Sequence, residues 1–244
     1  MMNRQLMVQR IDPECMPLIH LINQILQGYG QFILICGKQR IGKSTTGLSL
    51  AYILTWILNN ERFDVNKYVF FNALNFLKKT ITVRRRVMII DEASKDLTKS
   101  DWYTLLNQVL SKIIETQADL NNIFIVILPH ASRLATQHKI YVNVKIVMER
   151  RGVANFFYMD QKYGEMSSDI KKIMKAKWIK KWKVPIPPQK LWDEYETLSE
   201  KRKREIAQEE VARIRQKKKD WMCLVCNNVN RGEEIFCNNC GTSR

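Results

Sequence analysis

The sequence predicts an α/β fold with a mainly parallel sheet, followed by a charged helical extension and a small cysteine-rich module. Three observations support this prediction. Short apolar runs alternate with helical segments over the first two thirds of the chain. A glycine-rich loop joins one apolar run to a helix, and four cysteines stand in two pairs near the C-terminus. Alternating strands and helices are typical of βαβ units, whose strands run parallel.

The first motif follows the apolar run 32–36, which is typical of a buried parallel strand. The segment 45–58 after the motif is apolar enough for a buried helix. Between them stands a phosphate-binding loop of the pattern GxxxxGK[ST], and the strand before and the helix after it favour a true nucleotide site over a glycine-rich turn with a solvated lysine. The predicted nucleotide-binding residues are Gly37, Lys38, Gln39, Arg40, Ile41, Gly42, Lys43, Ser44 and Thr45.

The chemistry of this loop is specific. Two glycines allow backbone N–H groups to face the phosphates, and the helix N-terminus adds partial positive charge. We expect Lys43 to reach the β- and γ-phosphates and Ser44 to hold magnesium. ATP and magnesium are therefore the predicted cofactors.

A second apolar run, 87–90, ends in two carboxylates, Asp91 and Glu92. We expect Asp91 to meet the magnesium ion across from Ser44, and Glu92 to act as general base for the attacking water. Alone, the pair would also suit a helix N-cap after a buried strand. Together with the phosphate-binding loop, it predicts an ATPase.

The Asp-Glu pair and a further apolar run at 123–128 resemble the additional-strand, catalytic-glutamate division of P-loop ATPases. Within it, residues 30–165 are similar to the small HerA–FtsK-like ATPases of archaeal viruses and plasmids. The resemblance implies a RecA-like core whose extra strand lies between the P-loop strand and the Asp-Glu strand. It also implies that His130 senses the γ-phosphate, the alternative being a surface histidine in a turn. No helical lid segment follows the expected sheet, which argues against an AAA+ protein.

The same resemblance implies a homo-oligomeric ring in which a neighbouring subunit supplies an arginine to the γ-phosphate. Arg133 is our first choice because it follows the expected sensor strand, and Arg150 and Arg151 at a hairpin tip are the others. Each of the three would otherwise be a solvated basic residue.

Changes in composition divide the chain into an ATPase domain at 1–167, a basic helical extension at 168–220 and a zinc finger at 221–244. A helix is expected over 102–119, and a hairpin at Gly152. A charged helix at 189–219 follows a proline-rich break. The expected strands are 32–36, 67–72, 87–91, 123–128, 141–149 and 155–160.

The formal net charge of +16 indicates a polyanionic partner, with an anionic membrane surface as the alternative. The resemblance to HerA–FtsK-like ATPases implies that this partner is nucleic acid, and DNA rather than RNA. Basic residues gather at 171–183 and 201–219, where we expect phosphate contacts. Trp178 and Trp182 stand four apart among lysines on an expected helix, and they would otherwise pack on the core. No apolar run reaches the length of a membrane span and no signal-peptide pattern opens the chain, so we expect a cytoplasmic protein.

Four of the six cysteines form two CxxC pairs, the spacing of a zinc site rather than of cytosolic disulfides. Cys15 and Cys36 are isolated and are interpreted as packing residues. The predicted zinc ligands are Cys223, Cys226, Cys237 and Cys240. About two dozen residues cannot build a core unaided, so the metal would fold this module.

The pattern from Trp221 to Cys240 resembles the Ran-binding-protein type of zinc finger. Ubiquitin-binding members of that family carry a Thr-Phe type pair where this chain has Asn227 and Asn228, which argues against ubiquitin. RNA-binding members are matched in part, by Trp221, Asn228, Val229, Asn230 and Arg231. Two acidic residues, Glu233 and Glu234, count against guanine-specific reading of RNA. A zinc knuckle for protein contact is the remaining alternative.

These features predict an ATP-driven motor on nucleic acid, which translocates or packages DNA for a mobile element or virus. One alternative is a nucleotide-dependent adaptor or loader that recruits a protein through the zinc finger. The other is a membrane-associated assembly ATPase whose Lys- and Trp-rich region lies on lipid.

Overall fold

The computed structural model describes residues 16–91, 108, 111–113, 120–134, 141–159, 176–217, 221–230 and 234–243. The chain divides into two compact units, with the boundary after Ser199. Each unit is described by itself.

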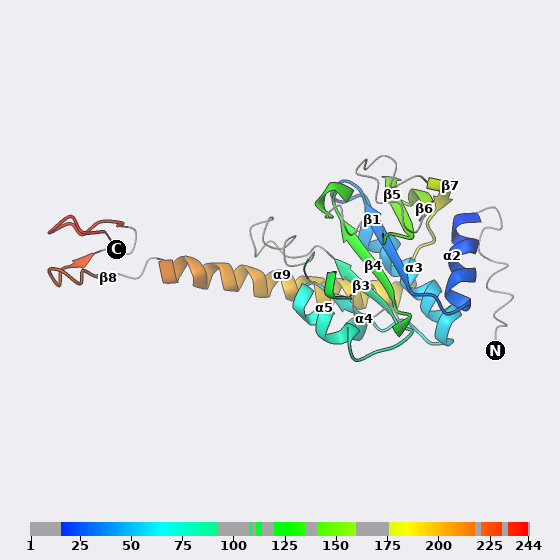
Figure 1. Cartoon of the computed structure of the whole chain (residues 1–244), viewed down its shortest axis with the longest axis horizontal. Helices are drawn as coiled ribbons and strands as arrows, with labels where there is room; N and C mark the ends of the chain where they lie inside the picture. The colour runs from blue at the N-terminus through cyan, green and yellow to red at the C-terminus, as the bar shows by residue number, and fades with distance from the viewer. Residues whose placement is uncertain are drawn as a thin grey trace. The chain divides into compact units, whose positions relative to one another are not determined.

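The described part of the first unit is built on a seven-stranded sheet with the order β2-β3-β4-β1-β5-β6-β7 (Figure 1). The five strands from β2 to β5 in this order pair in parallel, and β6 and β7 add antiparallel pairs at one edge. The predicted α/β class with a mainly parallel sheet is confirmed. The strands are β1 Gln31–Cys36, β2 Val69–Phe70, β3 Val87–Asp91, β4 Ile123–Leu128, β5 Val144–Arg150, β6 Val153–Met159 and β7 Ala176–Lys183.

Strand β4 lies between β1 and β3, as expected for the extra strand. Cys36 at the end of β1 pairs with Leu128 of β4, and Asp91 at the end of β3 pairs with Ile127. The carboxyl ends of β1 and β3 therefore meet at the same edge of the sheet. Ligands of open α/β sheets bind at this edge.

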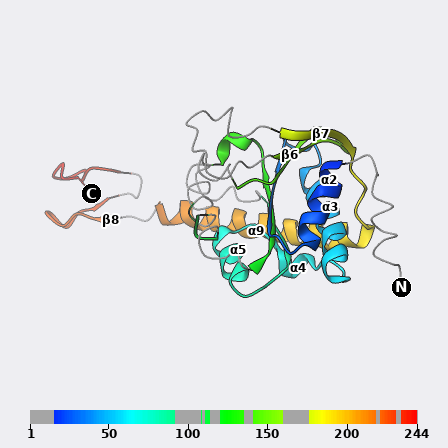
Figure 2. The same ribbon diagram turned by 45° about the vertical axis from the view of Figure 1, so that its right-hand side comes forward.

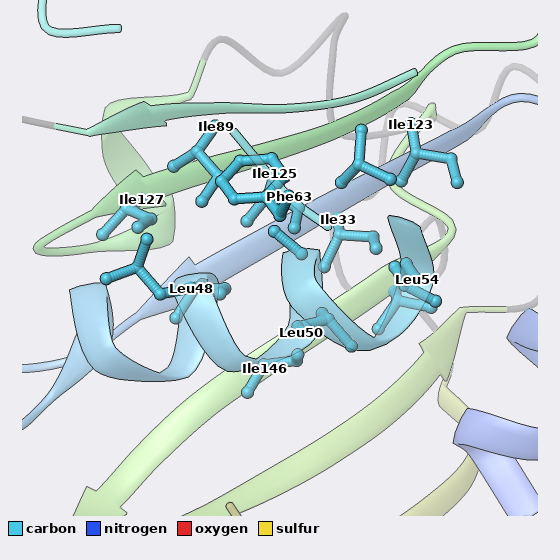
Figure 3. Close-up of a cluster of buried hydrophobic side chains, with 14 of the residues drawn as sticks. Ile33, Leu48, Leu50, Leu54, Phe63, Ile89, Ile123, Ile125, Ile127 and Ile146 are labelled. Atoms are coloured by element: carbon cyan, nitrogen blue, oxygen red, sulfur yellow. The ribbon is translucent and has the colours of Figure 1, made fainter. Parts of the chain in front are cut away.

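Helices cover both faces of the sheet (Figure 2). Alternate residues of β1 face opposite sides, so that Ile33 and Ile35 pack with α3, whereas Phe32 and Leu34 pack with Phe76 of α5. Figure 3 shows the first of these clusters, with the leucines of α3 against the isoleucines of β1, β3, β4 and β5. The helices are α2 Met16–Leu26, α3 Lys43–Asn59, α4 Val65–Tyr68, α5 Ala73–Thr80 and α9 Gln189–Lys217, with a 3-10 turn η2 at Ala131–Arg133.

Most of the expected strands are confirmed within a few residues, and the hairpin turns at Gly152, whose φ is 76°. The segment expected as strand 67–72 is different. Asp64 caps α4 by accepting from the Lys67 N–H, and Asn72 caps α5 by accepting from the Leu74 and Asn75 N–H groups. These two caps leave only Val69–Phe70 for β2. The expected helix at 102–119 lies largely outside the described residues, of which 108 and 111–113 are helical.

The prediction that Trp178 and Trp182 lie on a helix is wrong. Residues 176–183 form β7, which pairs with β6 throughout. Residues four apart share one face in a helix and also in a strand, so the spacing of the tryptophans fitted both structures. Trp182 is buried, and its ring meets that of Phe156 edge-on with 5.7 Å between centroids. Core packing by this tryptophan, the alternative expected from the sequence, is therefore observed on a strand.

The second unit contains the rest of α9 and the cysteine module. The expected charged helix is confirmed, and it begins at Gln189, directly after the proline-rich segment. The module contains two short antiparallel strands, β8 Trp221–Met222 and β9 Val229–Asn230.

Candidate nucleotide site and metal centre

The glycine-rich loop spans the gap between the end of β1 and the start of α3 at Lys43. A Cβ on Gly37 would lie 2.9 Å from the Cβ of Met148, so the loop passes too close to β5 for a side chain there. Gly42 has a φ of 95°, a left-handed conformation that glycine adopts without strain. The loop therefore needs both glycines for its shape, and it opens directly into the N-terminus of α3.

The ammonium group of Lys43 is folded back over the loop. Its Nζ donates to the carbonyl oxygens of Gly37 and Lys38, both at 2.8 Å. The N–H of Gly37 donates to the carbonyl of Pro129 at 3.3 Å, which holds the end of β4 against the loop. The lysine thus stands over the loop, where an anion bound by the backbone N–H groups would meet it.

Ser44 and Asp91 come together as expected. The Ser44 hydroxyl donates to Oδ2 of Asp91 at 2.6 Å, across 47 residues of sequence. Asp91 is only 6 % exposed, at the end of β3, which lies between β2 and β4 in the sheet. A hydroxyl and a carboxylate oxygen are hard ligands of the kind that magnesium prefers. The pair therefore fits the predicted metal ligands.

Tyr195, which the sequence analysis did not identify, completes this cluster. Its hydroxyl donates to the same Oδ2 of Asp91 at 2.7 Å. Burial of the phenol and, after it, the negative charge of Asp91 raise the pKa of Tyr195 above its ordinary value. The phenol is consequently a neutral donor at physiological pH. The available sequence signal was its position four residues after Leu191, at the spacing of a helix face turned toward a core.

A pocket of about 310 Å³ borders the loop. Cavities that bind small molecules start at about this size. One side of the pocket comes from the glycine-rich loop and the start of α3, and the rest from Arg151 and Trp192. The lining residues are Arg40, Gly42, Lys43, Ser44, Thr45, Arg151 and Trp192.

The remaining predicted site residues are Glu92, His130 and the three candidate arginines. Glu92 lies outside the described residues. His130 follows β4 and is exposed, and the backbone of Arg133 belongs to η2. Arg150 is exposed at the end of β5. Arg151 lines the pocket of its own chain, which suits an action within the subunit rather than in a neighbour.

The four predicted zinc ligands are brought together in the second unit. All four sulfurs lie within 4.8 Å of one another, with 3.5 Å between Cys223 and Cys240 and 3.4 Å between Cys226 and Cys237. Sulfurs bound to one zinc ion at about 2.3 Å would stand about 3.8 Å apart at the corners of a tetrahedron. The cluster therefore has the size and donor chemistry for zinc.

The two CxxC pairs have the same local structure. The Asn227 N–H donates to the carbonyl of Cys223, and the Gly241 N–H donates to that of Cys237, both at 2.8 Å. Both Asn227 and Gly241 have a left-handed backbone, with φ values of 57° and 72°. Burial opposes ionisation of Cys237, but the N–H groups of Cys240 and Asn239 lower the pKa of its thiol to about 6. A thiolate, the form that binds zinc, is favoured there.

Two residues that matched RNA-binding fingers have structural contacts inside the module. Asn230 is buried, and its side-chain oxygen accepts from the N–H of Asn238 at 2.9 Å. The Trp221 indole N–H donates to the carbonyl of Glu234 at 2.9 Å. Asn230 is therefore used to hold the second cysteine pair and is not displayed for a base.

The basic regions are only partly described. Residues 160–175 lie outside the described part of the chain, whereas Lys181 and Lys183 of β7 are exposed. Helix α9 mixes its charges, with eight Lys or Arg and seven Asp or Glu over its length. Ion pairs within the helix join Arg204 to Glu200 and Arg202 to Glu205. The helix thus has a net charge of only +1, eight minus seven, over its 29 residues, compared with +16 for the 244-residue chain.

No protein-family model matches the sequence, and no curated protein matches it either. In the part of the chain that the structure describes, no helix combines the length and apolar character that a membrane crossing requires.

Proposed function

We propose that the first unit is a magnesium-dependent ATPase whose site is formed by the loop 37–42, the start of α3 and Asp91. The hydrogen bond between Ser44 and Asp91 carries the proposal. It joins the first turn of the helix after a glycine-shaped loop to the end of a different buried strand. Packing alone does not require a polar pair there, whereas a metal bound beside phosphates does.

Each residue has a role that its position supports. The loop N–H groups and the N-terminus of α3 would receive the phosphates, and Lys43 would exchange its carbonyl partners for phosphate oxygens. Bound magnesium, held by Ser44 and Asp91, would neutralise charge that develops on the phosphate oxygens. Glu92, the next residue after Asp91, is the proposed base for the attacking water.

We also propose membership of the additional-strand, catalytic-glutamate division, with a RecA-like core of the HerA–FtsK-like type. The position of β4 between β1 and β3 supports it. So does the contact of Pro129 with Gly37, which brings the residues after β4 toward the phosphate loop and would suit His130 as a γ-phosphate sensor.

The proposed substrate of the motor is nucleic acid, with DNA preferred. The net charge of +16 and the exposed lysines of β7 and of α9 support a polyanion. The decisive experiment measures ATP hydrolysis alone and with double-stranded DNA, single-stranded DNA, RNA or anionic vesicles. The parent protein is compared with Lys43→Ala and with Lys78→Ala, which removes an exposed lysine of α5.

The motor is supported if Lys43→Ala loses hydrolysis, Lys78→Ala keeps it, and DNA stimulates hydrolysis by the parent protein. Stimulation by vesicles alone would favour the membrane-associated assembly ATPase. Equal hydrolysis by the parent and Lys43→Ala would reject the nucleotide site itself.

A second candidate, an adaptor that recruits a protein, is favoured by the surface of the zinc module. Its small size leaves large apolar side chains exposed, with Leu224 at 96 %. Such side chains suit protein contact better than phosphate contact. The test is the double change Leu224→Ser and Val225→Ser in the full chain. If zinc content and DNA affinity stay intact, these side chains serve neither zinc nor DNA binding and remain available to a protein partner. The exposed apolar residues are Met222, Leu224, Val225, Val229, Ile235 and Phe236.

A further inference from the structure

The pocket beside the phosphate-binding loop has one aromatic lining residue among those that the structure describes, Trp192. The other side chains on its wall are arginines, a lysine, a serine and a threonine, which suit phosphate and ribose oxygens. A nucleotide held by its phosphates on the loop must place its base somewhere along this wall. Among the described lining residues, the planar and apolar surface available to the base is the indole of Trp192.

The tryptophan is held firmly by its neighbours in the first turns of α9. Its backbone N–H donates to the carbonyl of Pro188 at 3.1 Å, and the preceding Leu191 is fully buried in the core. Its ring lies 5.5 Å from that of Tyr195, which is itself bonded to Asp91. The segment before the helix is fixed to α3, because Ser49 donates to the carbonyl of Pro185. An aromatic surface that is fixed before binding loses little entropy when a ligand stacks on it.

Trp182 and Trp192 both pack against the core, but they differ in how much of the ring is left exposed. Trp182 is 3 % exposed and lies inside the core, whereas Trp192 is only half-buried and reaches the pocket surface. A tryptophan needed for packing alone gains most from complete burial. The position of Trp192 leaves part of its ring to a ligand.

We propose that Trp192 is the stacking surface for the nucleobase, an inference that rests on the nucleotide site proposed above. Stacking uses the face of the base and does not read its edge, and the lining side chains that the structure describes include no carboxylate or amide. The site therefore prefers nucleoside triphosphates over inorganic tripolyphosphate and discriminates weakly between adenine and guanine.

The test compares the affinity of ATP and of tripolyphosphate, each with magnesium, for the full-length protein by calorimetry. The variants are Trp192→Leu, which keeps an apolar side chain without a ring, and Trp192→Phe, which keeps a ring. Stacking of a base on an aromatic ring corresponds to roughly 5- to 150-fold in affinity. We expect a loss of that order for ATP in Trp192→Leu, an unchanged affinity for tripolyphosphate, and recovery of most of the ATP affinity in Trp192→Phe.

Fluorescence of the unmodified protein gives a second measurement that does not depend on the folding of the leucine variant. ATP should quench indole emission, tripolyphosphate should not, and the quenching should disappear in Trp192→Phe. Equal ATP affinity in the parent and Trp192→Leu, or equal losses for ATP and tripolyphosphate, would overturn the stacking role. A parent protein that binds neither ligand would instead reject the nucleotide site, and the stacking role with it.

Discussion

The Tyr195 hydroxyl donates a 2.7 Å hydrogen bond to Oδ2 of Asp91, across 104 residues of sequence. The start of α9 is therefore part of the candidate magnesium site, although it follows the sheet and the proline-rich segment in the chain. An ion pair between Arg62 and Glu194 holds the same turn of α9 to the loop after α3. A chain that ended before α9 would lose this donor to the buried carboxylate.

Replacing Tyr195 with Phe should lower the free energy of unfolding without magnesium by about 1–2 kcal/mol, because a buried carboxylate loses a donor. The ring and its packing remain, so little else changes. Urea unfolding of the magnesium-free protein measures the effect. Tyr29→Phe, at a tyrosine that is 58 % exposed, is the matched control and should unfold like the parent. Identical unfolding midpoints for Tyr195→Phe and the parent would show that the bond contributes nothing.

Glu92→Gln should bind ATP with magnesium and fail to hydrolyse it, because the amide keeps the shape of the side chain but cannot accept the proton of water. General base catalysis contributes roughly 100- to 10,000-fold, so turnover should fall by at least that lower factor. Steady-state hydrolysis and nucleotide binding on the same preparation separate the two effects. A near-parental rate would remove Glu92 from the mechanism.

Purified protein should contain one zinc ion per chain, bound by the four clustered sulfurs. Metal analysis by mass spectrometry gives the content, and Cys237→Ser should reduce it because one ligand is lost. The matched control is Cys36→Ser, at a cysteine of β1 in the other unit. Burial raises the pKa of the Cys36 thiol to about 11. Protein without zinc but with disulfides among these cysteines would contradict the site.

Removal of residues 221–244 should leave basal hydrolysis in place.

Affinity for DNA should fall steeply with salt, since binding through charge releases counterions. Lys201 and Lys203 are exposed on α9, and their joint replacement by Ala should weaken binding to all sequences alike. The plot of log affinity against log salt should become less steep by about two, at ~0.9 per neutralised phosphate. The control removes two other exposed lysines, Lys78 and Lys112. Affinity that hardly changes between about 50 and 200 mM salt would exclude this mode of binding.

The sequence was sufficient to predict the strand, glycine-rich loop and helix α3, and the place of Asp91 at the end of β3, because apolar runs and glycines at fixed spacing constrain local structure. It was insufficient for β7, since Trp178 and Trp182 share a face in either a helix or a strand. Tyr195 could not be placed because its partner is set by the tertiary path of the chain. The clustering of the four cysteines was predictable, whereas the structural role of Asn230 needed its contact with Asn238. Contacts between residues of recognisable motifs, such as Ser44 with Asp91, were thus predictable, whereas contacts of residues outside any motif were not.

The position of Arg151 in the pocket of its own chain allows the proposed ring to be tested by mixing variants. Arg133→Ala and Arg151→Ala should both bind ATP, and each should lose turnover if its arginine stabilises the transition state. An arginine finger supplied by a neighbour is worth roughly a thousandfold or more. Mixing Arg133→Ala with Lys43→Ala should restore activity, because one subunit offers an intact loop and the other the arginine.

The same mixture made with Arg151→Ala should stay inactive, since every intact loop would then lack the arginine of its own subunit. Hydrolysis by the two mixtures, measured at equal subunit ratios, therefore assigns each arginine to its own or to the neighbouring site. Recovery with Arg151→Ala would reverse our assignment of that residue. If neither mixture recovers and the active protein sediments as a monomer with ATP and DNA, the ring is rejected. The adaptor would then be the better account of the chain.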